Sequence, residues 1–478
     1  MNTYNELENI MNRSIVRILL TFLCLNLLII SCDDNDIPIY EFPITVTLSQ
    51  HTIDANLTNP FSVEIHLSDM DKFTKMEIYK QDRKGNSLIG TVDKTKFENS
   101  TYTFSYRVTE KDDDTFSFSF KVFADSKSTL RTLYVNNKYG LMLSNLTMLS
   151  RVTGKSLANE TLPNINTTHL LYELSATDLG IIWEIGPGKV GIFFGDSYGG
   201  NFVPGDNGGP NNGTDWRANV LAFSENKNLD DGLIFSGMAM DSLNSKRARE
   251  IIPRWKYKSF TSIPTSAIEI QGVQYVHFMN WQVFGGEEYF NYSSIYKSTD
   301  KGLNWSSCED LVKFPANSLF GQIGYAKRDG YVYMIGTPIG RKNSARLARF
   351  LEKDILNHNQ YEYWNGIYKK WMTGSESLAT VILDGTVGEM SVMYLEKYQK
   401  WLILYFDEQA YAICYRTASE LNGEWSKERV LASGNQYPQL YGSYMHPFAN
   451  NDDTIYFTMS LWWQYNVFFM RANIVELN

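Results

Sequence analysis

The chain has 478 residues, of which 43% are hydrophobic and 20% are charged. These proportions exclude a disordered, collagen-like or disulfide-dense chain. The formal net charge of -9, with 53 Asp and Glu against 44 Lys and Arg, argues against a nucleic-acid partner. Aromatic residues make up 14% of the chain beside 33 glycines, a mixture that favours β-structure over helix.

The amino-terminal residues 1–32 are predicted to be a targeting segment. Arg13 and Arg17 precede the apolar run Ile18–Ile30, which is typical of a secretory signal peptide. The run ends in Ile-Ser-Cys, which resembles a bacterial lipobox, so Cys32 is expected to carry the lipid. An acidic stretch follows and resembles signals for the outer cell surface, although solvated linker charge explains it equally well. We therefore expect an exported lipoprotein of the outer membrane, held at the cell surface.

Residues 38–140 contain short runs in which apolar and polar side chains alternate, among them FSVEIHLS, YTFSYRV and DTFSFSFKVFA. A period of two residues with closely spaced polar turns predicts a small β-sandwich. No cluster of His, Cys or carboxylate side chains stands out in it, which indicates an accessory domain or spacer. Residues 141–168 have weak periodicity and are predicted to be a linker.

Residues 169–478 are predicted to form a five-bladed β-propeller. The segment Ser298–Trp305 matches the Asp-box S-x-D-x-G-x-x-W, in which the Asp closes a hairpin and the Gly supplies a positive φ. Weaker echoes end at Trp364 and Trp425, so tryptophans recur about every 60 residues, the period of a propeller blade. One set of strands before these and one after give five blades. The closing strand is expected from residues 168–174. The predicted fold class is all-β, a five-bladed propeller preceded by a small β-sandwich.

The first hairpin of the propeller holds two aspartates. A three-residue loop at Gly186–Gly188 would place Asp178 opposite Asp196, with Cβ atoms roughly 4.5–5.5 Å apart. Two carboxylates that close suit glycoside cleavage, in which one donates a proton while the other attacks or activates water. Asp196 follows an apolar run that could raise its pKa, so we expect Asp196 to be the acid and Asp178 the base or nucleophile. The alternative, that each Asp merely caps a turn, stays open.

Several strings around these aspartates resemble a known propeller family. They are TDLG, FGD, WRANVLAFS, GEMSVMY, YGSYMHP and SLWWQYNV, spread over residues 170–478. The family was formerly known only as a domain of unknown function, and its characterised members are endo-acting glycoside hydrolases of D-arabinofuranan, such as that of arabinogalactan and lipoarabinomannan. The resemblance implies an endo-D-arabinofuranase in which Asp178 and Asp196 match the acidic motif. The long Gly-rich loop at 201–213 and Ser197 after FGD depart from the family pattern.

Further site residues are predicted around this pair. Glu389, which follows Gly388 at the start of a strand, is a candidate third carboxylate that tunes the pair or contacts sugar. Candidate substrate contacts combine aromatic rings, which pack on sugar CH faces, with polar tips that bond hydroxyls. They are Asp215, Trp216, Arg217, Tyr444, His446 and Trp462. The alternative for Glu389 is an ordinary strand-end residue, and for each aromatic residue it is a place in the core.

No cofactor is expected, because the six histidines are scattered without ligand spacing. A structural Ca²⁺ or Na⁺ in the propeller channel is left open, as is a Cys308–Cys414 bridge against two free thiols. The expected partners are a polysaccharide substrate and, through Cys32, the membrane, and the chain is expected to be a monomer.

Two alternatives to the furanosidase stay open. A sialidase-like hydrolase would need three arginines for a substrate carboxylate, and a non-catalytic glycan-binding lipoprotein would bind polysaccharide without releasing products. The arginines available are Arg217, Arg254, Arg349 and Arg416.

Overall fold

The computed structural model describes residues 42–477, except 57–58, 110, 138–139, 201, 207, 211–214, 254–260, 285–286 and 450–451. The predicted signal peptide with Cys32 lies outside the described residues, and so does Arg254. Over the part of the chain that is described, no helix is long and apolar enough to cross a membrane.

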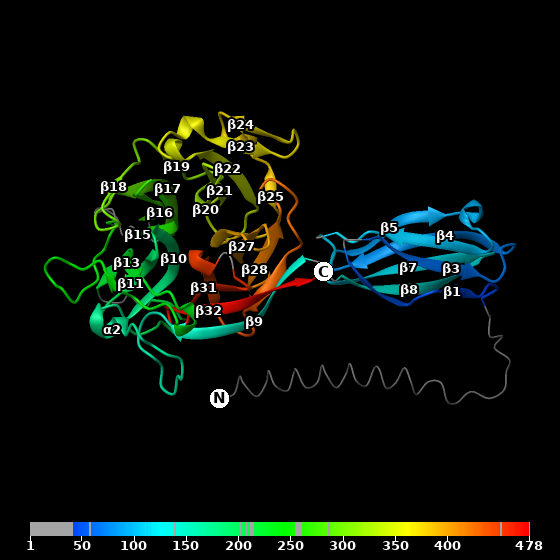
Figure 1. Cartoon of the computed structure of the whole chain (residues 1–478), viewed down its shortest axis with the longest axis horizontal. Helices are drawn as coiled ribbons and strands as arrows, with labels where there is room; N and C mark the ends of the chain where they lie inside the picture. Colours follow the sequence, from blue (N-terminus) through cyan, green and yellow to red (C-terminus); the bar gives the residue numbers. More distant parts are fainter. Residues whose placement is uncertain are drawn as a thin grey trace.

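The amino-terminal part forms two packed sheets beside a ring of five further sheets (Figure 1). One sheet of the sandwich contains, in spatial order, β1 (Val46–Leu48), β3 (Phe61–Leu67) and β6 (Thr101–Tyr106). The other contains β2 (Thr52–Ala55), β8 (Lys127–Asn137), β7 (Thr115–Ala124), β4 (Phe73–Asp82) and β5 (Gly85–Val92). Alternate side chains of β3 are buried, as the period of two requires. Phe104 and Phe118 meet between the sheets at 4.8 Å, within a core that contains no propeller residue.

The ring consists of one sheet per blade over the described residues, which agrees with the predicted five-bladed propeller. Blade 1 contains β10 (Ala176–Gly186), β11 (Lys189–Tyr198), β12 (Trp216–Arg217), β13 (Val220–Ser224) and β14 (Gly237–Met238). Blade 2 contains β15 (Thr261–Ile270), β16 (Val273–Phe284), β17 (Glu287–Ser298), β18 (Ser306–Ser307) and β19 (Lys313–Pro315). Blade 3 contains β20 (Gln322–Arg328), β21 (Tyr331–Thr337), β22 (Ala345–Leu351), β23 (Glu362–Asn365), β24 (Lys370–Thr373) and β25 (Val381–Leu383).

Blade 4 contains β26 (Met390–Leu395), β27 (Lys400–Asp407), β28 (Ala412–Ala418) and β29 (Arg429–Ser433). Blade 5 contains β30 (Leu440–Met445), β31 (Thr454–Leu461), β32 (Asn466–Leu477) and β9 (Gly140–Arg151). The inner strands β10, β15, β20, β26 and β30 each contact the next, and β30 contacts β10, which closes the ring. The described helical pieces are one turn of α-helix, α2 (Thr168–Leu171), and 3₁₀ turns at Lys94–Lys96, Leu229–Asp231, Glu352–Asp354, His358–Gln360, Glu376–Leu378 and Pro447–Ala449.

The strand that closes the ring is β9, which pairs antiparallel with β32. The expected closing strand at 168–174 was therefore wrong, since residues 168–171 form α2, and the predicted linker at 141–168 is contradicted only over residues 141–151, which belong to β9. The alternation in β9 is hard to recognise because its register shifts beside Asn145, which has φ of 51°. Such a bulge moves the following side chains to the opposite face.

The Asp-box at the end of β17 has the geometry that its motif predicts. Asp300 accepts a hydrogen bond from the backbone N–H of Asn304 at 2.8 Å, and Gly302 has φ of 87°. The Trp305 indole donates to the Gly302 carbonyl at 2.8 Å and packs against Phe193 of blade 1. The echo residues Trp364 and Trp425 pack in one apolar cluster of blades 3 and 4. These tryptophans therefore join blades, as their spacing indicates.

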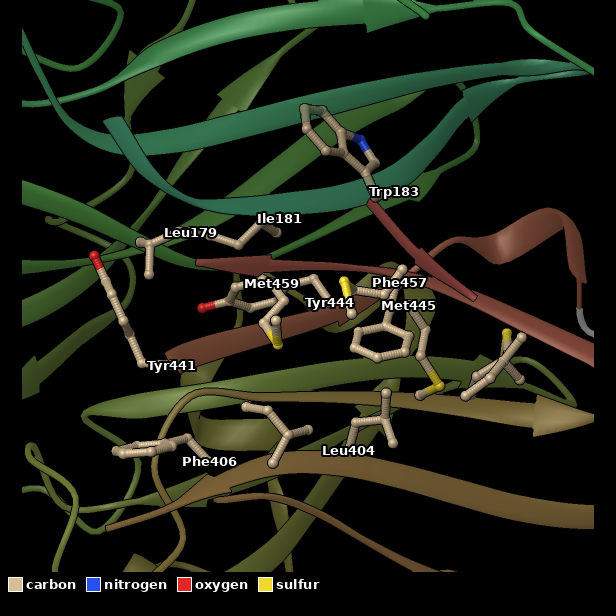
Figure 2. Packing of buried hydrophobic residues seen from close by; sticks show 14 of the residues in the cluster. Leu179, Ile181, Trp183, Leu404, Phe406, Tyr441, Tyr444, Met445, Phe457 and Met459 are labelled. Atoms are coloured by element: carbon tan, nitrogen blue, oxygen red, sulfur yellow. The ribbon is translucent and has the colours of Figure 1, made fainter. Parts of the chain in front are cut away.

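Cys308 and Cys414 are both buried and both free, which settles the choice between bridge and thiols. They lie in separate apolar clusters. The centre of the propeller is packed by side chains of the inner strands, including Leu179, Tyr444 and Met445 (Figure 2).

The sandwich contacts blade 4 through charged groups. Asp114 accepts from the Lys427 ammonium at 2.8 Å and from the Arg429 guanidinium at 3.1 Å, and both cations are largely buried. Lys111 pairs with Glu424 at 2.9 Å near the solvent. One carboxylate thus pairs with two cations at the contact between the two parts of the chain.

Candidate active site

A cavity of about 1090 Å³ opens at one end of the propeller channel. It lies where the inner strands begin, because residues at the start of β10, β15, β20 and β30, and Glu389 just before β26, all line it. Asp178, Asp196 and Glu389 lie in this one cavity, together with Glu408. The structure therefore brings together the three carboxylates that the sequence analysis proposed as catalytic.

The hairpin that carries the two aspartates differs from its predicted form. The turn consists of Pro187 and Gly188, and Gly186 pairs with Lys189 beside it. Moving away from the turn, the register of the two strands shifts between Gly186 and Glu184. Further from the turn, Thr177 pairs with Ser197 and Leu179 pairs with Phe194. Asp178 therefore lies opposite two residues of the facing strand. The prediction that Asp178 directly opposes Asp196 was therefore wrong in detail, because a bulge interrupts the ladder there.

Backbone conformation and a glycine make room for the Asp178 carboxylate. Leu179 and Gly180 have φ of 66° and 92°, so the chain bends immediately after the aspartate. On the facing strand, a Cβ at Gly195 would lie only 2.3 Å from Asp178 Oδ1. A side chain at position 195 is therefore incompatible with the observed carboxylate position.

Asp178 is a carboxyl group whose pKa is strongly raised. Burial and repulsion from Asp196 raise its pKa to about 8, while hydrogen bonds from the hydroxyls of Tyr441 and Tyr465 act in the opposite direction. The Tyr441 hydroxyl donates to Asp178 Oδ2 at 3.0 Å. Figure 2 shows the hydroxyls of Tyr441 and Tyr444 at the same end of the apolar cluster. Asp178 is therefore protonated near neutral pH, as a proton donor must be.

Asp196 has a different environment, although it lies in the same cavity. Its Oδ1 accepts hydrogen bonds from the Trp216 indole at 2.8 Å and from the Thr261 hydroxyl at 2.5 Å. Two donors stabilise negative charge on a carboxylate. Asp178 also accepts hydrogen bonds, so donors alone do not distinguish the two carboxyl groups, but the raised pKa of Asp178 favours the reverse of the expected assignment, with Asp178 as the acid.

Glu389 is bound on both oxygens by one arginine. Arg341 Nε lies 3.0 Å from Oε1 and 3.2 Å from Oε2, and Arg341 Nη2 lies 2.5 Å from Oε1. The same guanidinium lies over the rings of Phe406 and Tyr441, at 5.1 and 5.3 Å from their centroids. The acidic neighbour raises the pKa of Arg341, which stays charged. Glu389 thus completes an ion pair beside Tyr441, the donor to Asp178.

Three of the predicted sugar contacts line the cavity. Trp216 does so while its indole holds Asp196. Trp462 is 40% exposed, and its ring is held by edge-on contacts with Tyr441 and Tyr465. Tyr444 lies deeper in the channel and is almost fully buried. The exposed ring of Trp462 offers the broadest apolar surface for a sugar among these three.

The other three predicted contacts lie away from the described lining of the cavity. Arg217 is 1% exposed and donates to the backbone carbonyls of Glu173 and Ala248, at 2.7 and 2.8 Å. Asp215 is held by Arg247 in a 2.5 Å ion pair. His446 follows the far end of β30 and is fully buried, and burial lowers its pKa to about 3. Arg217 and His446 are too buried to contact a sugar, because sequence proximity to a site residue does not place a side chain on the same face, and the role of Asp215 stays a prediction.

Sequence reasoning missed Arg341, Tyr441, Tyr465, Trp281 and Gln322, all of which line the cavity. Tyr441 and Tyr465 stand in the strings YGSYMHP and SLWWQYNV, but no spacing rule distinguishes them from core tyrosines. Arg341 follows β21 in a loop with no local signal. These residues come from different blades, so only ring closure brings them together.

The sialidase-like alternative finds no support among the described lining residues, where the arginine present is Arg341, already paired with Glu389. Arg349 pairs with Glu362 and Arg416 with Asp384, both outside that lining. Within the described ranges, no group of three His, Cys, Asp or Glu side chains is arranged to hold a metal ion.

Residues 164–471 match the family described as "Domain of unknown function (DUF4185)". Two fungal proteins are similar over 60% of this chain. Notoamide biosynthesis cluster protein J' of Aspergillus versicolor is 26% identical over 310 residues, 81% of its length. Notoamide biosynthesis cluster protein J of Aspergillus sp. (strain MF297-2) is 24% identical over 311 residues, 80% of its length. Among solved structures, Zg3597, a family 117 glycoside hydrolase from Zobellia galactanivorans, matches with a TM-score of 0.40 and 12% identity, covering 69% of this chain and 90% of its own.

Proposed function

We propose that the propeller of this chain, which belongs to the family described as Domain of unknown function (DUF4185), is a glycoside hydrolase domain. The observation that carries the proposal is the unlike pair of carboxyl groups in one cavity. Burial of its carboxyl group and repulsion from Asp196 raise the pKa of the half-buried Asp178 to about 8, whereas Oδ1 of Asp196 accepts hydrogen bonds from Trp216 and Thr261. Groups of the same type with divergent environments are the usual division between an acid and a base or nucleophile.

In this proposal, Asp178 is the general acid. It gives its proton to the glycosidic oxygen as the bond between that oxygen and the anomeric carbon breaks. The Tyr441 hydroxyl, 3.0 Å from Oδ2, orients the carboxyl group and receives no proton. Since Asp178 is protonated below about pH 8, the acid is in the required form at neutral pH.

Asp196 acts as the ionised partner. It either attacks the anomeric carbon or removes a proton from the water that does so. Trp216 and Thr261 fix its Oδ1 and so orient the carboxylate in the cavity. Glu389 is a positioning residue in this scheme, because Arg341 occupies both of its oxygens.

The proposed substrate is a D-arabinofuranan polysaccharide, cut internally. The cavity volume of about 1090 Å³ and the exposed Trp462 ring suit a chain of several sugar units. The support for D-arabinofuranan as the substrate is the resemblance of the acidic motif and of the strings YGSYMHP and SLWWQYNV to endo-D-arabinofuranases. The lipid anchor at Cys32, the outer-membrane location and an accessory role for the sandwich belong to the same proposal.

The deciding experiment is hydrolysis of D-arabinan by the purified protein and its variants. Release of oligosaccharides by the native protein is expected, and Asp178→Asn and Asp196→Asn should each lower kcat by at least about a thousandfold without any fall in melting temperature at pH 6. L-arabinan and sialoglycans serve as controls for specificity. Full activity of both variants would overturn the carboxylate assignment. Binding of D-arabinan without product would instead indicate the non-catalytic alternative.

A further inference from the structure

Two buried N–H groups of the cavity have no hydrogen-bond partner within the described part of the chain. They are the indole Nε1 of Trp281 and the amide Nε2 of Gln322. Gln322 is 4% exposed, so solvent does little to satisfy its amide. Buried donors without partners cost free energy and are few in folded proteins. Their presence in a cavity indicates that a ligand supplies the missing acceptors.

The two groups lie on the Asp196 side of the ring. Trp281 of β16 pairs directly with Thr261 of β15, whose hydroxyl donates to Asp196. Gln322 begins β20, the next inner strand after β15. The exposed ring of Trp462 belongs to blade 5, which contacts blade 1 from the other direction. The carboxylates of blade 1 therefore have possible contacts for a substrate on both sides.

The surface around the two donors combines apolar side chains with a few neutral polar ones, namely Thr261, Thr265 and Asn343. No charged group of the described lining belongs to blade 2, and the cations of blade 3, Arg341 and Lys342, pair with Glu389 and Glu408. A surface of apolar and neutral polar side chains with two neutral donors matches a sugar ring, which has CH faces and hydroxyl oxygens. A charged ligand would find no unpaired opposite charge among these residues. The apolar lining of blades 2 and 3 consists of Ile263, Pro264, Met279 and Ile339.

We propose that Trp281 and Gln322 form a sugar subsite on the Asp196 side of the cleavage point, in which they donate hydrogen bonds to hydroxyl oxygens of the neighbouring sugar unit. The inference rests on the proposed function and deepens it, because an endo-acting enzyme holds sugar units on both sides of the bond it cuts. The subsite determines specificity and takes no part in proton transfer. A unit that lacks those hydroxyls leaves the donors unpaired, so the site discriminates against it.

The test uses variants that remove a donor and keep the apolar bulk. For Trp281→Phe and Gln322→Met, kcat/KM on a D-arabinan hexasaccharide should fall by about tenfold to a hundredfold, mainly through KM. The melting temperature should stay equal or rise, because each substitution removes an unpaired donor. The matched control is Trp305→Phe, whose indole bonds the Gly302 carbonyl outside the cavity. That variant should lose melting temperature and keep its KM.

Unchanged kcat/KM in both cavity variants of an active enzyme would overturn the subsite. A fall in melting temperature with unchanged KM would do the same, because it would indicate a purely structural role. Failure of the proposed hydrolase is distinguishable, since the native protein would then release no oligosaccharide. In that case calorimetric binding of the hexasaccharide still tests the subsite. Tenfold weaker binding by Trp281→Phe than by the native protein would support it, and equal binding or none by the native protein would overturn it.

Discussion

Replacing Gly195 by alanine is the most direct test of where Asp178 must lie. The added Cβ would stand 2.3 Å from Asp178 Oδ1 and 3.0 Å from the Leu179 side chain. Ordinary contacts begin near 3.4 Å, so the carboxyl group has to move by about 1 Å. A displacement of that size from the reactive geometry lowers kcat by about a hundredfold. The bond from the Tyr441 hydroxyl, now 3.0 Å long, should be lost as well.

The assay compares initial rates of oligosaccharide release from D-arabinan at saturating substrate. Gly237→Ala is the matched control, because Gly237 lies in the same blade and an added Cβ there would meet no atom within 4 Å. We expect kcat of the control to equal that of the native protein. Overpacking in Gly195→Ala should cost about 1–3 kcal/mol of stability, so the rates are compared well below its melting temperature. A folded Gly195→Ala protein with native kcat would refute Asp178 as the acid.

Three further predictions concern other groups. Because the pKa of Asp178 is raised to about 8, kcat should fall as the pH rises through 8. The stability contributed by the protonated carboxyl group is lost as the pH rises, so Asp178→Asn should raise the melting temperature more at pH 9 than at pH 4. Trp216→Phe removes the donor to Asp196 but keeps the ring, so initial rates should give a kcat/KM about tenfold lower. Asp114→Ala leaves the buried Lys427 without its partner, and urea denaturation should show a loss of about 1–2 kcal/mol.

The blade repeat was predictable from sequence because each blade carries its own local marks. The Asp-box at Ser298–Trp305 and the spaced Trp364 and Trp425 result from contacts within one blade or between neighbours. The closing strand β9 has no such mark. Its partner β32 lies at the other end of the chain, and the bulge at Asn145 hides its alternation.

The candidate site was predictable only where it lies within one hairpin. Asp178 and Asp196 belong to adjacent strands, so turn length alone brings them close, although it could not reveal the bulge between them. Tyr441 and His446 show the opposite case. Both belong to the string YGSYMHP, yet one bonds Asp178 and the other is buried beyond the far end of β30. Which of the two side chains reaches the cavity depends on where β30 begins and ends, and the sequence pattern does not determine those bounds.

The pairing of β9 with β32 has a consequence for synthesis of the protein. Arg151 pairs with Phe468, so the ring joins segments made about 300 residues apart. Until the last strand leaves the ribosome, β9 is an open edge able to pair with other chains. Contacts this distant in sequence slow folding and prolong exposure of such edges. In a truncated chain that begins after Arg151, β32 would keep an unpaired edge permanently. Production of the propeller alone therefore requires a chain that includes β9.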